Sequence, residues 1–99
     1  MAKLNNIHPG EILEEEFIKP LEITAYRLSK ETNIPATRIS QIIKGNRSIT
    51  ADTALRFSKY FGTTPDFWMG LQMEFDLRQE YQLKEKEINK IKRLEKIGA

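Results

Sequence analysis

The chain has 99 residues, of which 39% are hydrophobic and 30% are charged, and its formal net charge is +2. This composition indicates a single folded domain with a small core and excludes an intrinsically disordered chain. No apolar run approaches the roughly 20 residues that cross a bilayer, no apolar stretch near Met1 resembles a secretion signal, and cysteine is absent. We therefore expect a cytoplasmic protein without disulfides, thiolate metal sites or a membrane partner.

The spacing of apolar residues is helical almost throughout, and it predicts an all-α fold. The first predicted helix starts after His8, with Pro9 in its first turn, where the missing N–H costs nothing. Pro20 ends this helix because proline disfavours a helical conformation at the residue before it. One side of the helix carries Ile12, Leu13, Phe17 and Ile18, and the outer face carries the acidic run Glu14, Glu15 and Glu16.

Residues 24–44 predict a helix-turn-helix. Thr24 is a favourable N-cap, and Asn33 tolerates the left-handed conformation that follows a helix end. Pro35 then opens a second helix, which Gly45 closes. These signals place two short helices around one tight turn.

The two helices of this motif need a shared core. The small side chain of Ser29 would let the second helix cross closely over the first, and we expect Tyr26 or Ser29 to lie near the inward-facing Leu28. The predicted core of the motif consists of Leu28, Ile34, Ile39 and Ile42.

Two more helices follow. Thr50 caps the fourth helix and Gly62 ends it. Residues 64–66 (Thr-Pro-Asp) supply a cap, a first-turn proline and a first-turn acid, which together predict the start of the fifth helix. The fifth helix is apolar nearly all round. The residues expected to face the core are Phe67, Leu71, Phe75 and Leu77. The residues left over, which we expect at a homodimer interface because aromatics and methionine are enriched there, are Trp68, Met69, Met73 and Tyr81.

The last part of the chain is rich in lysine and glutamate. Ile88, Ile91, Leu94 and Ile97 recur every three residues, a spacing that favours a helix continuing from residue 81, although a fraying tail stays open. We therefore divide the chain into a helix-turn-helix and dimerisation domain, residues 1–82, and a charged C-terminal helix or tail, residues 83–99.

The distribution of charge points to nucleic acid. Residues 23–50 carry five basic residues against one acid, whereas residues 11–22 carry five acids against one lysine. Glutamine and arginine in the exposed face of the second motif helix pair with purine edges in the major groove. Thr24 at a helix N-terminus and the basic Lys44 and Arg47 would contact phosphates. The alternative is a plain helical hairpin with a polar outer face.

Catalysis is not expected. His8 is the only histidine and cysteine is absent, so the chain offers no nucleophile–base pair and no metal-ligand set. We therefore expect neither an enzyme nor a bound cofactor.

Three blocks of sequence, in addition to the helix-turn-helix, resemble one family. They are His8 to Leu13, Gly45 to Arg56, and Phe61 to Gln72. Together they make the chain similar to the HigA/VapI-type antitoxins of the Xre, or lambda-repressor-like, helix-turn-helix family over about residues 7–80. The resemblance implies a five-helix lambda-repressor-like domain with an additional C-terminal charged segment.

The resemblance also implies a function. Such proteins dimerise, repress their own promoter by binding operator DNA, and neutralise a RelE/HigB-like, mRNA-cleaving toxin. The base-reading positions that it implies here are Ala36, Thr37, Arg38 and Gln41. If the toxin is basic, the acidic run at residues 14–16 would be its docking surface. Two alternatives stay open: a regulator without a toxin partner, and a protein-interaction module that has lost operator binding.

Overall fold

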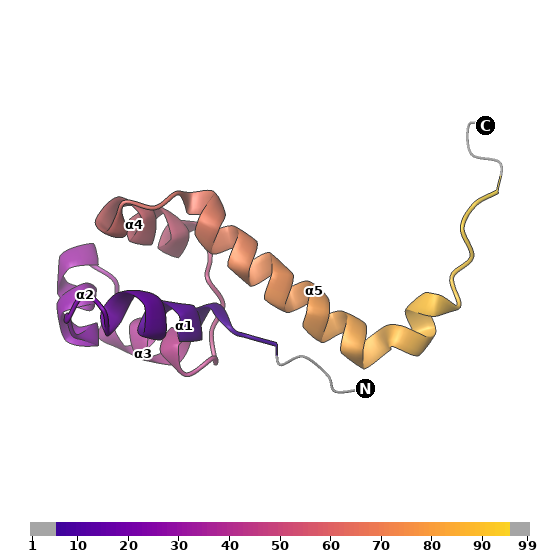
Figure 1. Ribbon diagram of the computed structural model, residues 1–99, viewed down its shortest axis with the longest axis horizontal. Coiled ribbons are helices and arrows are strands. Elements are labelled where there is room, and N and C mark those ends of the chain that lie inside the picture. The colour runs from indigo at the N-terminus through magenta and orange to yellow at the C-terminus, as the bar shows by residue number, and fades with distance from the viewer. Residues whose placement is uncertain (1–5, 96–99) are drawn as a thin grey trace.

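The computed structural model describes residues 6–95, and this part of the chain contains helices and connecting turns without any strand (Figure 1). The elements in order are α1 (Pro9–Ile12), η1 (Leu13–Ile18), α2 (Ala25–Thr32), α3 (Ala36–Ile43), α4 (Ala51–Phe61) and α5 (Pro65–Asn89). Since α1 runs directly into η1, the two form one continuous helix. The predicted five-helix, all-α fold is confirmed.

The predicted caps explain where the helices begin and end. Thr24, Thr50 and Thr64 each accept a hydrogen bond from the backbone N–H three residues further on, which satisfies one of the free donors of a helix start. Asn33 and Gly62 adopt the left-handed conformation at the ends of α2 and α4, with φ of 60° and 76°.

The first helix has a feature that the sequence did not predict. Its second half, η1, is a π-helix, in which the Lys19 N–H donates to the carbonyl of Glu14, five residues back, at 3.0 Å. The wider turn ends just before Pro20. The chain then reverses through Glu22, which has a positive φ of 54°.

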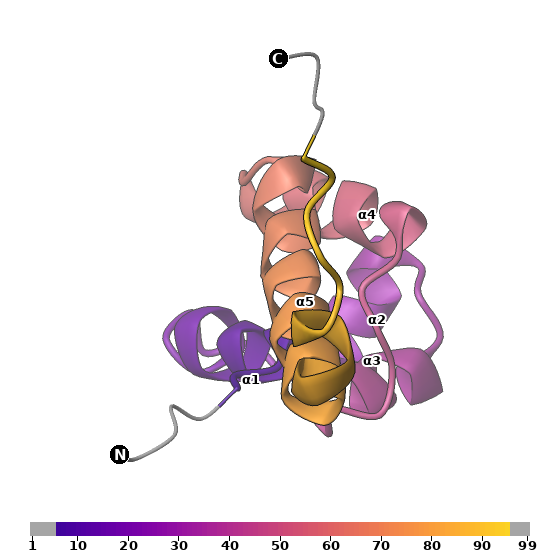
Figure 2. The same ribbon diagram turned by 90° about the vertical axis from the view of Figure 1, so that its right-hand side faces the viewer.

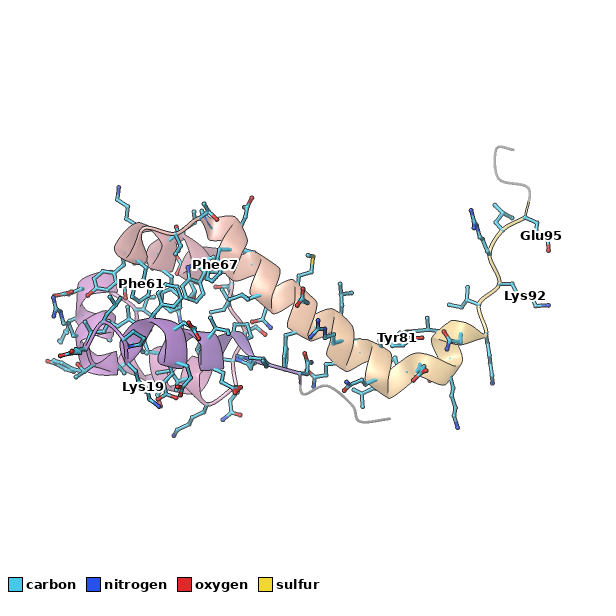
Figure 3. All side chains as sticks on the ribbon, in the orientation of Figure 1. Lys19, Phe61, Phe67, Tyr81, Lys92 and Glu95 are labelled. Carbon is cyan, nitrogen blue, oxygen red and sulfur yellow. The ribbon has the colours of Figure 1, made fainter. Side chains whose placement is uncertain are left out.

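One hydrophobic core joins all the helices, and its aromatic part lies between the first helix, α4 and the first half of α5. Its centre is Trp68, which is 0% exposed and whose ring centroid lies 5.0 Å from those of Phe17 and Phe57. The indole N–H of Trp68 donates to the hydroxyl of Thr63 at 2.7 Å, so the one polar atom of the ring is satisfied. Figure 3 shows Phe61 and Phe67 at the same junction.

Three expectations about α5 are therefore wrong. Trp68, which was expected at a dimer interface, is buried. Phe67 and Leu77, which were expected to face the core, are 39% and 64% exposed. The inward stripe of α5 follows the helical spacing i, i+3, i+4, i+7 from Trp68. It consists of Trp68, Leu71, Gln72 and Phe75.

The second half of α5 extends away from the other helices in Figure 1, and in Figure 2 the same helix runs toward the viewer. Every residue from 76 to 95 is exposed. The helix departs from helical dihedral angles at Lys84 and ends at Asn89. The expected continuation beyond residue 81 is thus correct up to Asn89 and wrong for residues 90–95, while Ile97 lies outside the described residues. Among residues 6–95, no helix is both long and apolar enough to cross a membrane.

Candidate DNA-binding site

The helix-turn-helix forms as the sequence predicts. Its core residues Leu28, Ile34, Ile39 and Ile42 are each at most 2% exposed. Ser29 is buried between the two helices, and its hydroxyl donates to the carbonyl of Ile34 in the turn. Of the two residues expected beside Leu28, Ser29 is therefore the correct one, because Tyr26 is 67% exposed.

Helix α3 presents the predicted base-reading residues on its outer side. Ala36, Thr37 and Gln41 are exposed, as is Lys44 at the end of the helix, whereas Arg38 is half-buried. No acid lies between Ala36 and Lys44. The surface thus offers small, hydrogen-bonding and basic groups, which is the set of side chains that can enter a major groove.

Two of these side chains are held by neighbours. The Nε of Arg47 donates to the Oε1 of Gln41 at 2.9 Å, which leaves the amide N–H groups of Gln41 as its free donors. The Nη1 of Arg38 lies 3.4 Å from a carboxylate oxygen of Asp52, in the first turn of α4. Sequence reasoning missed Asp52, because it is 14 residues away from its partner.

Thr24, at the N-terminus of α2, can accept one hydrogen bond and donate another. Its Oγ1 accepts the backbone N–H of Arg27 at 3.0 Å, and its hydroxyl proton stays available for another acceptor, such as a phosphate. Thr24 is exposed. The site residues therefore come from the start of α2, the outer face of α3 and the loop that follows it.

The other predicted surfaces are separate from this one. Glu15 and Glu16 are exposed on η1, where Glu15 pairs with Lys19 at 2.8 Å, while Glu14 is half-buried. Tyr81 lies far along α5 (Figure 3). The predicted DNA-contacting residues, the acidic run and the exposed Met69, Met73 and Tyr81 therefore lie on different elements, whereas Trp68 belongs to the core.

His8 acts as a helix cap. Its Nδ1 accepts the N–H of Gly10 at 2.8 Å, and its ring meets Phe75 edge-on at 4.9 Å. Burial lowers the pKa of His8, against an opposing effect of the nearby Asp76 carboxylate. The neutral imidazole is the form that can accept this hydrogen bond. Within residues 6–95, no group of three metal-binding side chains comes together.

Comparison with known proteins settles the class. Residues 15–68 match the family model described as Helix-turn-helix. Virulence-associated protein I of Dichelobacter nodosus is 44% identical over 79 residues, which cover 80% of this chain and 73% of that protein.

The chain belongs to the Xre-like helix-turn-helix family. Members of known structure share its fold closely. The Pseudomonas aeruginosa antitoxin HigA, solved with the higBA promoter, superposes with a TM-score of 0.88 at 37% identity, over 92% of this chain and 100% of that one. The antitoxin GraA in complex with its operator gives 0.85 at 38% identity, over 96% and 97%. The expected resemblance to HigA/VapI-type proteins is confirmed.

Proposed function

We propose that the chain is an antitoxin and autorepressor that reads operator DNA through the outer face of α3. The observation that carries this proposal is the acid-free row of exposed Ala36, Thr37 and Gln41, flanked by the basic Lys44 and Arg47. Arg38 completes the base-reading set, and Thr24 adds a phosphate contact. The HigA and GraA relatives, whose structures contain promoter or operator DNA, support this assignment.

Replacing Gln41 with alanine is expected to weaken binding to the preferred duplex by about 1–3 kcal/mol and to relax specificity at one base pair. Replacing Lys44 with alanine should weaken binding to all duplexes alike, because its contact is to a phosphate. The slope of log affinity against log salt concentration should fall by about one. Fluorescence anisotropy with preferred and shuffled duplexes measures both effects. Gln79→Ala and Lys59→Ala, which alter exposed side chains on α5 and α4, are the matched controls. Equal affinities of all four variants would show that the reading face is misassigned.

We propose that the functional unit is a homodimer, because a helix-turn-helix reads two half-sites about one helical turn apart. The surface that supports this is an exposed stripe along α5 with a spacing of four residues, whose members are between 39% and 64% exposed. The stripe consists of Met69, Met73, Leu77 and Tyr81. It retains three of the four residues expected at a dimer interface and replaces the buried Trp68 with Leu77.

We propose that the acidic run binds and neutralises a RelE/HigB-like toxin through complementary charge, without catalysis and without a cofactor. Reversing the exposed Glu15 and Glu16 to lysine should slow association with a basic toxin by roughly tenfold at low salt, since electrostatic steering dominates the on-rate. Stopped-flow mixing with the toxin encoded beside this chain's gene measures the rate. The same double reversal at Glu85 and Glu87 is the control. An unchanged association rate would show that Glu15 and Glu16 are not part of the toxin-binding surface. If the wild-type protein does not bind the toxin at all, a regulator without a toxin partner is favoured.

This function places the protein in the cytoplasm, together with the operator and the mRNA-cleaving toxin. The runner-up is a protein-interaction module that keeps the fold without reading DNA. The binding measurement on Gln41 and Lys44 separates the two, because such a module would show no dependence on either residue.

A further inference from the structure

The carboxylate of Asp52 lies at the meeting point of three helices. It is the second residue of α4, where a negative charge is favourable near the helix N-terminus. Its two oxygens lie 3.0 and 3.1 Å from the Nε of Arg56, one helical turn further along α4. One of them also faces the Nη1 of Arg38 on α3 at 3.4 Å.

Arg56 fixes this carboxylate to the first helix of the motif. Its Nη1 donates to the carbonyl of Thr32, the last residue of α2, at 3.0 Å. A cation is favourable at that end of a helix. The chain of contacts therefore runs from α2 to Arg56, along α4 to Asp52, and from there to Arg38 in the first turn of α3. Its two outer links join different helices, and the middle one lies within α4.

Arg38 is the one half-buried member of the four base-reading residues. Its side chain is 31% exposed, and its contact with Asp52 uses one of the five donors of the guanidinium. The other donors stay available for a guanine edge. A free arginine loses considerable rotamer entropy when it becomes ordered on DNA, so an arginine already held in place loses less.

We infer that Asp52 is a positioning residue for operator recognition: its carboxylate holds Arg38 in one orientation on the outer face of α3. This inference rests on the proposed function. It makes a prediction opposite to that of simple charge repulsion, because loss of the carboxylate should cost sequence discrimination even where it increases affinity for DNA in general.

The test uses the full chain and the duplex that the wild-type protein prefers, selected from a randomised pool. The specificity ratio is the dissociation constant for a shuffled duplex divided by that for the preferred one. Asp52→Asn should lower this ratio by about fivefold, the size of a typical coupling between contacting side chains. In an Arg38→Ala background the same change should have no further effect.

Asp66→Asn is the matched control, because Asp66 is also an exposed acid at the second position of its helix. It removes the same charge and should leave the specificity ratio unchanged. Asp52→Glu, which retains the carboxylate, should restore part of the discrimination. The thermal midpoints of Asp52→Asn and Asp66→Asn are compared as well. Equal midpoints would show that a lower specificity ratio in Asp52→Asn is not caused by a loss of stability.

Three results would contradict the positioning role of Asp52, the reading role of Arg38 or DNA recognition itself. If Asp52→Asn strengthens binding to both duplexes equally, or lowers the ratio as much without Arg38 as with it, the positioning role is wrong. If Arg38→Ala leaves the wild-type ratio unchanged, Arg38 is not a reader and the inference falls, while DNA binding by the other residues stands. If the wild-type protein selects no preferred duplex, the proposed function itself fails.

Discussion

Replacing Trp68 with alanine is expected to lower the free energy of unfolding by about 3–5 kcal/mol, a large part of the stability of a domain of this size. The indole is 0% exposed and packs between the rings of Phe17 and Phe57, so its removal leaves a cavity that joins the first helix, α4 and α5. It also removes the hydrogen bond to Thr63. Urea unfolding followed by circular dichroism measures the change.

The neighbouring Phe67 provides the control for Trp68. It is 39% exposed, so Phe67→Ala should cost clearly less than the tryptophan variant. If the two variants had equal urea midpoints, Trp68 would not be the centre of the core.

Gly10→Ala is expected to destabilise the domain by about 3 kcal/mol, although alanine is normally the better helix residue. A β-carbon at this position would lie 1.7 Å from the carbonyl oxygen of Ile42, so α1 and α3 could not keep their present separation. Because α3 carries the reading face, the variant should also lose affinity for DNA. Thermal unfolding and anisotropy together measure the two effects.

Gly70→Ala is the matched control for the close approach at Gly10. Gly70 lies inside α5, and a β-carbon there would meet no atom of another element within 4 Å. This variant should therefore gain about 0.5–1 kcal/mol from the lower backbone entropy of alanine. Destabilisation of similar size at both glycines would show that steric contact with α3 is not the cause.

The parts of the fold that could be predicted from the sequence are those set by local chemistry. Thr24, Thr50 and Thr64 cap their helices as expected, and Asn33 adopts the left-handed conformation, because each choice depends on a few neighbouring backbone groups. The isoleucine stripe of α3 was equally clear, since Ile39, Ile42 and Ile43 fall on one side of a helix whose other residues are small or polar.

The orientation of α5 was not predictable in the same way. Apolar residues surround the helix, so helical spacing alone does not distinguish Trp68 from Leu77 as the inward residue. What decides is the position of Phe17 and Phe57, which come from other elements and pack on Trp68. The contacts of Asp52 with Arg38 and of Arg56 with Thr32 are likewise non-local, and a single sequence does not reveal them.

Selection of duplexes from a randomised pool by the wild-type protein, followed by a salt titration of the best one, tests the central account most directly. We expect a palindrome whose half-sites lie about one helical turn apart, with an affinity that falls linearly on a log–log plot against salt. Substituting Gln41 should then relax the selected sequence at symmetric positions. A pool that yields no preferred sequence, or binding that does not respond to salt, would contradict DNA recognition by α3.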